Sequence, residues 1–493
     1  MLRSDGEASE IPPAQDTAAT SRRAAPQSEH GSVASASALL LLRRALTLVT
    51  AGLSTALLSR MLQPASFGEL QVGLAAWTFA TGMADLAFSQ VLGRELVATG
   101  RERAALLRTG YQVQGMWALF VTAGLAGAGL LAGADTTSGQ VLLVMCPTVA
   151  ATGLAGGRAV LLAMNDVRVL VRVDLLCNIV LSVGMVLAAM AGGGPVAVAA
   201  VFSLFTAANA LVLGVIGQRR SGLATPARGA RRRLVHLVVP LSLASVFGKI
   251  YLTAPLLMLG WLSTSEDAGQ FGGAARIIAT LNTVVAVVMA AALPALARAR
   301  ARDEPAAFAA LATKLLGWLV LGALPLFIVV GVLSGPVTRL ALGPSYGEAG
   351  ELTAVLACAG LLATLTQLFQ TILVSASHTR PMLYQSAAAA LLCTSGNILL
   401  IPSYGGHAAA WLTVVTELLV CAGAIVSARA LMPSARLLHD VWRPVLVVGA
   451  SGAVLALLSA WPLPAIAAAA VTYAILTWQL RCWPTDWRRP LHR

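Results

Sequence analysis

The feature that most constrains this chain is a long series of apolar segments. A helix needs roughly 20 apolar residues to cross the hydrocarbon core of a bilayer, and about fourteen segments of this sequence meet that measure. We predict spans near 39–60, 68–90, 110–133, 139–163, 169–191, 195–217, 234–262, 270–297, 308–333, 350–375, 382–402, 406–430, 441–460 and 463–481. Because 57% of the residues are hydrophobic and only 11% are charged, an ordinary soluble enzyme is excluded. The sequence predicts an all-α polytopic membrane protein.

Positive charge is distributed unevenly among the connecting loops. Lys and Arg concentrate in the cytoplasmic loops of membrane proteins. Here they gather in alternate loops, around 94–108, 158–172, 219–233, 298–314, 380 and 429–443. The other loops contain only Arg60 and Arg339, so we expect both termini to be cytoplasmic. The net charge of +13 arises from these clusters. They lack interleaved aromatic residues and zinc-finger spacing, so nucleic acid is not an expected partner.

The longest basic linker divides the predicted spans into two sets of six. We expect a disordered cytoplasmic tail at 1–36, a first six-helix bundle at 37–217 and a basic cytoplasmic linker at 218–233. A second six-helix bundle at 234–430, two additional transmembrane helices at 431–481 and a cytoplasmic tail at 482–493 would follow. Gly68 and Gly269 occupy equivalent places after the first span of each set. This similarity favours two repeats that share one orientation in the membrane.

Charged residues inside apolar spans are costly, and they usually face a protein interior or a watery cavity. Four such positions stand out: Asp85, Lys249, Arg276 and Glu417. Lys249 lies roughly 20 Å from either end of its span, which is too far for its ammonium group to reach the interface easily. Ser245 shares the helical face of Lys249, and Thr280 shares that of Arg276. These stripes predict a polar cavity for substrate.

Lys249 and Arg276 also have structural interpretations. Lys249 either lines a substrate cavity or forms an ion pair with Asp85 or Glu417. Arg276 lies about two turns inside its span, so it either faces the cavity or extends to the membrane surface as an anchor.

The other charged candidates leave similar choices. Asp85 either takes part in ion coupling or pairs with a loop arginine such as Arg94. Glu417 is either a proton or cation-coupling site or a neutral structural carboxyl group. Arg43 and Arg44 either contact substrate or mark the inner boundary of the first span.

Nothing in the sequence indicates a catalytic or metal centre. The six cysteines are scattered and form no CxxC pair, the histidines are dispersed, and there is no Walker A motif. The loops opposite the basic ones are too short to hold a catalytic domain. We therefore predict no cofactor, no metal and no enzymatic activity.

Several short segments resemble those of a known family. They are LLSRMLQPASFG at 57–68, DLAFSQ at 85–90, REL at 94–96, GQFGGAAR at 269–276, LGPSY at 342–346 and IPSYGGHAAA at 401–410. They resemble the bacterial polysaccharide flippases of the Wzx type, which belong to the multidrug, oligosaccharidyl-lipid and polysaccharide (MOP) exporter superfamily. The resemblance covers about 39–430.

The resemblance implies a fold and a cargo. The fold would be two six-helix bundles arranged in a V, with two extra helices, and it would work by alternating access in the bacterial inner membrane. The cargo would be an oligosaccharide linked to undecaprenyl pyrophosphate. Arg276 matches an arginine that contacts the pyrophosphate in relatives, whereas Lys249 matches no motif. In relatives that flip lipid II the last two helices bind the lipid tail, so 441–460 and 463–481 are candidates for that role.

The same resemblance implies a monomer that works with a polysaccharide polymerase and with chain-length or export proteins. Two other functions stay open from the sequence. One is a cation-coupled drug or metabolite antiporter of the same superfamily, which several acidic groups in the binding site would favour. The other is a membrane glycopolymer polymerase.

Overall fold

The computed structural model describes residues 26–85, 103–164, 166–221, 230–432 and 437–480, and within them the chain is helical. The first half forms α1 (Pro26–Met61), α2 (Pro64–Asp85), α4 (Arg103–Leu131), α5 (Thr137–Ala151), a 3-10 turn (Thr152–Leu154), α6 (Gly156–Ala163), α7 (Val167–Met190) and α8 (Pro195–Ser221). The second half forms α9 (Ala230–Leu262), α10 (Ser265–Ala301), α11 (Pro305–Gly322), α12 (Leu324–Val332), α13 (Ser334–Leu342), α14 (Gly347–Ser375), α15 (Arg380–Arg429), α16 (Leu437–Leu457) and α17 (Pro462–Gln479).

Local sequence sets where these helices begin and bend. Helices α2, α8, α11 and α17 each start at a proline, whose fixed φ suits the first helical position. Helix α10 starts after Thr264, whose side-chain oxygen accepts a hydrogen bond of 3.1 Å from the backbone N–H of Asp267. The long helix α15 bends at Gly405, where φ is 53°. This bend separates the two predicted spans 382–402 and 406–430.

Each predicted span coincides with one or more of these helices, with some differences. The predicted span 139–163 is interrupted by the 3-10 turn, and 308–333 is divided at Ala323 before the proline of α12. Helix α13 was not expected. Helix α1 begins at Pro26, within the segment 1–36 that was expected to be a disordered tail. Residues 1–25, residues 222–229 of the predicted linker and the predicted tail 482–493 lie outside the described residues.

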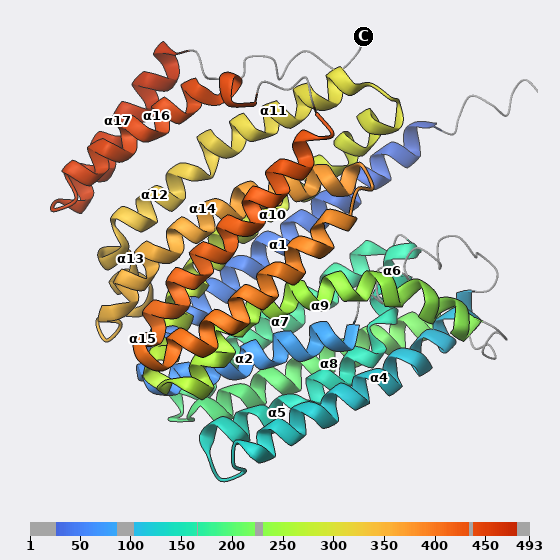
Figure 1. Ribbon diagram of the computed structural model, residues 1–493. Helices are drawn as coiled ribbons and strands as arrows, with labels where there is room; N and C mark the ends of the chain where they lie inside the picture. The colour runs from blue at the N-terminus through green and yellow to red at the C-terminus, as the bar shows by residue number, and fades with distance from the viewer. Residues whose placement is uncertain (1–25, 86–102, 165, 222–229, 433–436, 481–493) are drawn as a thin grey trace, which may run out of the picture.

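The helices pack into two groups that follow each other in the sequence (Figure 1). In the first group α1 packs on α7, and α5 packs on α2, α4 and α8. In the second group α14 and α15 pack together, α15 also contacts α9, and α14 also contacts α10. Helix α2 joins the groups, because it contacts both α9 and α10. Helices α16 and α17 pack on α11 and α12 at the edge of the second group (Figure 1).

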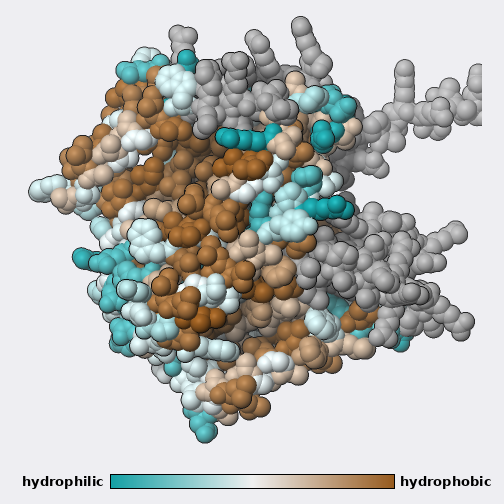
Figure 2. All heavy atoms as spheres, in the orientation of Figure 1, coloured by the Kyte–Doolittle hydropathy of each residue, from teal (hydrophilic) through white to brown (hydrophobic). Residues whose placement is uncertain are grey.

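The surface of the helices is suited to hydrocarbon. Within the described residues, nine helices are long and apolar enough to cross a membrane. Large apolar side chains are exposed, including Leu131 at 92%, Trp478 at 81% and Leu463 at 80%. Figure 2 shows apolar side chains over much of one face. Exposure of this extent is unfavourable in water, so the chain is an all-helical membrane protein.

The two groups touch closely where α2 and α10 begin. A Cβ atom on Gly68 would lie 1.9 Å from the carbonyl oxygen of Ser265, and one on Gly269 would lie 1.9 Å from that of Pro64. The two glycines that occupy equivalent places in the halves therefore face each other across the contact. Only glycine allows two backbones to come this close. We call this contact, together with the neighbouring end of α1, the segment from Leu340 to Tyr346 and the bend at Gly405, the closed end.

Further contacts join the helices at the closed end. The hydroxyl of Ser59 donates a hydrogen bond of 3.1 Å to the carbonyl of Leu342, and the guanidinium of Arg60 donates to the carbonyl of Leu340. The amide of Gln270 donates to the carbonyl of Ser345 at 3.3 Å. These bonds tie α1 to the last turn of α13, and α10 to the segment between α13 and α14.

An aromatic contact and the bend in α15 complete the closed end. The ring of Phe67 packs edge-on against that of Tyr346, with centroids 5.8 Å apart. The bend at Gly405 lies against the side chain of Asp267. Four segments that resemble flippase motifs, 57–68, 269–276, 342–346 and 401–410, therefore meet or adjoin at one end of the protein.

Candidate functional site

A polar cavity of about 640 Å³ lies within the first helix group. Side chains from α1, α2, α5, α6, α7 and α8 line it. Its volume falls within the range of about 300–1,000 Å³ that is typical of ligand sites. Predicted site residues Arg43, Arg44 and Asp85 all contribute to its lining.

The centre of the cavity is an ion-pair network around Asp174 of α7. Asp174 is only 6% exposed, and its carboxylate accepts hydrogen bonds from Arg43 of α1 and, at 2.6 Å, from Arg158 of α6. The amide of Asn209 on α8 donates a third bond at 3.2 Å. Burial of a carboxylate is tolerated only with such partners. The network therefore ties α1, α6, α7 and α8 together.

The charges of the cavity do not cancel. Its charged lining residues are three arginines, Arg43, Arg44 and Arg158, and two aspartates, Asp85 and Asp174. One positive charge is therefore in excess. The Nε atom of Arg43 is buried and has no hydrogen-bond partner among the described residues.

The uncharged polar groups of the cavity add hydrogen-bonding capacity. The hydroxyl of Thr50 donates to the side-chain oxygen of Asn178, a lining residue, at 2.6 Å. Asp85 accepts a bond of 3.2 Å from Gln114 of α4. Its predicted alternative partner, Arg94, lies outside the described residues. A site with excess positive charge and amide and hydroxyl groups can bind an anion that carries hydroxyl groups.

Arg276 lies apart from this network, on α10. Its side chain is exposed, and its guanidinium forms no hydrogen bond or ion pair with the residues that the structure describes. The hydroxyl of Thr280 donates to the backbone carbonyl of Arg276 at 2.9 Å, one turn earlier in its own helix. The hydroxyl of Thr253 donates to the backbone carbonyl of Lys249 in the same way at 2.7 Å. The predicted hydroxyl stripes therefore serve their own helices at least in part.

Lys249 extends along α2 from its position on α9. The Cγ atom of Lys249 would lie 2.9 Å from a Cβ on Gly82, so the alkyl stem packs on the glycine backbone. Lys249 forms no salt bridge with Asp85, Glu417 or any other acidic residue in the described ranges. The predicted ion pair is therefore absent there. Ser245, one turn earlier, is half-buried and has an interaction partner of its own.

Glu417 lies in a separate polar cluster of the second group. Its Oε2 atom is buried without a hydrogen-bond partner among the described residues. Tyr251 of α9 and Cys393 of α15 lie within electrostatic range of it. The buried oxygens of Asn397 and Thr416 also lack partners within the described part of the chain. The unpaired carboxyl oxygen of Glu417 could accept a proton or bind a cation, but Glu417 belongs to a different helix group from Asp85.

Sequence reasoning missed the centre of the cavity. Asp174 stands five residues inside the predicted span 169–191, next to Arg168 and Arg172, and was not distinguished from the loop charges. Arg158 was assigned to a basic loop. The signal was the same as for the other charged candidates, a carboxylate inside an apolar segment, but its nearness to the predicted boundary concealed it.

Comparison with solved structures identifies the fold. The chain superposes on the lipid II flippase MurJ in an inward closed conformation with a TM-score of 0.75 and 13% identity, over 90% of this chain and 98% of that one. An inward-facing multidrug resistance MATE family transporter of the MOP superfamily gives 0.57 and 13%, over 79% and 96%. A MOP superfamily transporter from Pyrococcus furiosus, described by the reverse polarity of its binding pocket, gives 0.56 and 11%, over 81% and 96%.

Comparison with sequences gives the family. None of the curated protein sequences matches the chain significantly. The family described as "Polysaccharide biosynthesis protein" matches residues 35–300, which is more than half of the chain and includes nearly all of the first helix group, α9 and nearly all of α10. The resemblance to Wzx-type flippases and the MOP-type fold are thereby confirmed, and the chain belongs to the polysaccharide biosynthesis protein family.

Proposed function

We propose that this protein moves undecaprenyl-pyrophosphate-linked oligosaccharide units from the cytoplasmic to the outer leaflet of a bacterial inner membrane. The observation that carries the proposal is the positively charged polar cavity around Asp174, inside a member of the polysaccharide biosynthesis family. A pyrophosphate diester carries about two negative charges, which unscreened hydrocarbon would strongly disfavour. Fixed arginines in a polar cavity lower that barrier, and amide and hydroxyl groups bind sugars. The membrane itself accommodates the polyprenyl tail.

The proposed mechanism is alternating access between the two helix groups. In this proposal the fourteen predicted spans form two six-helix bundles, 37–217 and 234–430, and two additional helices, with both termini cytoplasmic. The closed end would then face the outside, which agrees with the sparse positive charge of its loops. The cavity would receive substrate from the cytoplasmic side. Opening of the Gly68–Gly269 contact would release the substrate outward.

Within this mechanism the predicted residues take separate roles. Arg43 and Arg44, in the cavity, and Arg276, Lys249, Thr280 and Ser245, on α9 and α10, would contact the pyrophosphate and sugars. Glu417 and Asp85 would couple transport to a proton or cation gradient. The unpaired buried oxygen of Glu417 supports this role. Coupling to a gradient is also what the alternative function, a drug or metabolite antiporter, would require.

An impermeant sugar-labelling reagent applied to spheroplasts tests the proposal. In cells that lack the protein, we expect full-length lipid-linked oligosaccharide to accumulate in the inner leaflet, where the reagent does not reach it. Expression of the protein should restore labelling. If the oligosaccharide already faces outward without the protein but stays unpolymerised, the flippase assignment is refuted and a polymerase function is favoured. If neither the leaflet nor the length of the oligosaccharide changes, the antiporter is favoured.

A further inference from the structure

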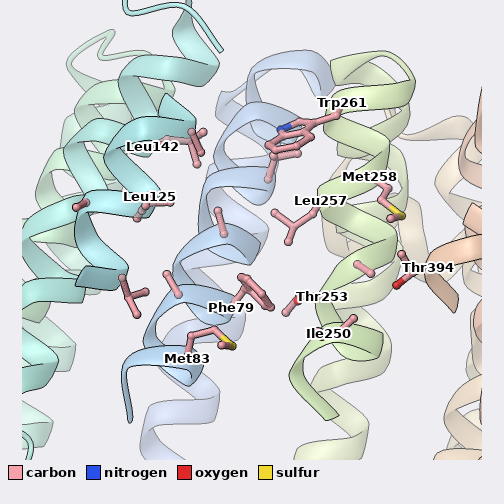
Figure 3. A pocket seen from close by; sticks show the side chains of 18 of the residues that line it. Phe79, Met83, Leu125, Leu142, Ile250, Thr253, Leu257, Met258, Trp261 and Thr394 are labelled. Carbon is pink, nitrogen blue, oxygen red and sulfur yellow. The ribbon is translucent and has the colours of Figure 1, made fainter. Parts of the chain in front are cut away.

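An apolar groove of about 800 Å³ runs between the two helix groups (Figure 3). Helices α2, α4 and α5 of the first group and α9 and α15 of the second line it. Most of its lining side chains are apolar. Of the few polar ones, Thr253 donates its hydroxyl to the carbonyl of Lys249, and Trp117 donates its indole N–H to the carbonyl of Met83 at 2.8 Å. The groove therefore offers hydrocarbon contact almost exclusively.

The groove has a buried floor and an exposed rim. On the floor, Val72, Leu142 and Ala254 are less than 9% exposed. On the rim, Phe120 is 68% exposed and Trp261 is 70% exposed. Such a groove is open along its side, so a flexible chain can enter it from the surrounding lipid. From Ile250 to Trp261 it follows α9 for about 16 Å, roughly half the hydrocarbon thickness of a bilayer.

One end of the groove adjoins a cation. Lys249 precedes Ile250, a lining residue, and its stem lies over Gly82, which precedes the lining residue Met83. Its ammonium has no ion-pair partner within the described ranges. An unpaired cation at the end of a long apolar groove complements an amphiphile with an anionic head and a single long chain.

The depth of Lys249 selects among such amphiphiles. Lys249 is thirteen residues from the end of α9 at Leu262, or roughly 20 Å along the helix. Phosphate groups of resident phospholipids stay at the membrane surface, so they do not reach this depth. A lipid whose phosphates are being carried through the membrane does reach it.

We propose that the groove binds the polyprenyl chain of the substrate while its diphosphate contacts Lys249. This inference rests on the proposed function and adds to it the place where the tail is held. It differs from the expectation that the last two helices bind the tail. Helices α16 and α17 pack on α11 and α12, away from α2 and α4 (Figure 1).

Two matched glycines allow a direct test. Gly124 lines the groove, and Gly449 lies on α16, and a Cβ on either would meet nothing within 4 Å. Benzoylphenylalanine is introduced at each position, and the purified full-length protein is irradiated with undecaprenyl diphosphate in lipid nanodiscs. Mass spectrometry then measures the covalent adduct. We expect at least tenfold more undecaprenyl adduct at Gly124 than at Gly449, and a loss of most of it in the Lys249→Gln background.

The inference is overturned if the adduct forms equally at both positions, preferentially at Gly449, or with phospholipid in place of undecaprenyl diphosphate. An adduct that is unchanged by Lys249→Gln overturns the placement of the diphosphate. The wild-type protein is assayed in parallel for transport of lipid-linked oligosaccharide. Transport without labelling at Gly124 refutes the groove alone, whereas absence of transport refutes the proposed function.

A second test fills the groove. We expect Gly124→Trp to lower transport of the full-length carrier at least tenfold but to leave a short-chain carrier unaffected, since a short chain does not need the groove. Gly449→Trp is the matched control and should leave both rates unchanged. Equal effects of Gly124→Trp on both carriers, or no effect on either, would contradict the proposal. Because the comparison is between substrates of one purified variant, poor folding cannot imitate the expected result.

Discussion

The contact between Gly68 and Gly269 makes a quantitative prediction about the closed end. In Gly68→Ala the new methyl group would lie 1.9 Å from the Ser265 carbonyl oxygen and 2.6 Å from the Gly269 nitrogen. Both neighbours are backbone atoms, so they cannot rotate away. Helices α2 and α10 must separate by about 1 Å or more, and overpacking of this kind costs about 1–3 kcal/mol. Because 1.4 kcal/mol corresponds to a factor of ten, the closed population should fall by about 5- to 150-fold relative to the open one.

Spin labels on Met61 and Leu340, both exposed at this end, measure the change by double electron–electron resonance in a cysteine-free background. We expect a longer distance in Gly68→Ala than in the unsubstituted protein, together with slower transport. Gly52→Ala is the control, because a Cβ at Gly52 would meet nothing within 4 Å. If Gly68→Ala matches Gly52→Ala in both distance and transport, the closed-end contact does not control opening.

A double variant separates this effect from general damage. Gly68→Ala and Gly269→Ala disturb the same contact, so their effects on the distance distribution should be less than additive. Full additivity would mean that the two substitutions act at independent places, which would contradict the geometry.

Three further predictions concern the charged residues. Asp174→Ala leaves two arginines without their carboxylate, so it should destabilise the protein by about 3 kcal/mol, seen as a lower Tm in detergent; an unchanged Tm would show that the network does not stabilise the helix group. Lys249→Ala or Arg276→Ala should lower transport with membrane insertion intact, measured by the spheroplast assay and by immunoblotting of membranes; normal export in both would remove the cationic-site hypothesis. Glu417→Gln should abolish the dependence of transport on an imposed ion gradient in proteoliposomes, and retained dependence would place the coupling site elsewhere.

The apolar pattern predicted most of the fold because a transmembrane helix must be apolar over a known length. The predicted spans coincide with helices, and the bend at Gly405 falls in the gap between the predicted spans 382–402 and 406–430. The pattern did not predict α13, nor the 3-10 turn before α6. Helix α13 lies between two apolar segments, and the 3-10 turn lies within one. A count of apolar residues detects neither, because it does not distinguish one helix from two.

The candidate site was predicted less completely, because helix rotation is not encoded in apolar length. Arg43 was singled out at the inner boundary of the first span and Asp85 as a charge within the second, and both line the cavity. Arg158 of α6 and Asp174 of α7 were not singled out, because both stand near predicted span boundaries, where charges are common. Which acidic residue neutralises which arginine depends on how α1, α6 and α7 face one another, and only tertiary packing sets that.

The position of the motif-like segments explains what the sequence identifies and what it leaves open. Segments 57–68, 269–276, 342–346 and 401–410 gather at or beside the closed end, where backbone contacts and a glycine bend impose strict steric demands. If the closed end is the gate of the proposed mechanism, its steric demands would be the same for any cargo. The cavity around Asp174 lies outside these four segments, and in the proposed function its charges and amides would contact the substrate. In the proposed function these four segments would form a gate shared by the family, whereas the choice of sugar would depend on the cavity, to which the motif-like segment 85–90 contributes Asp85.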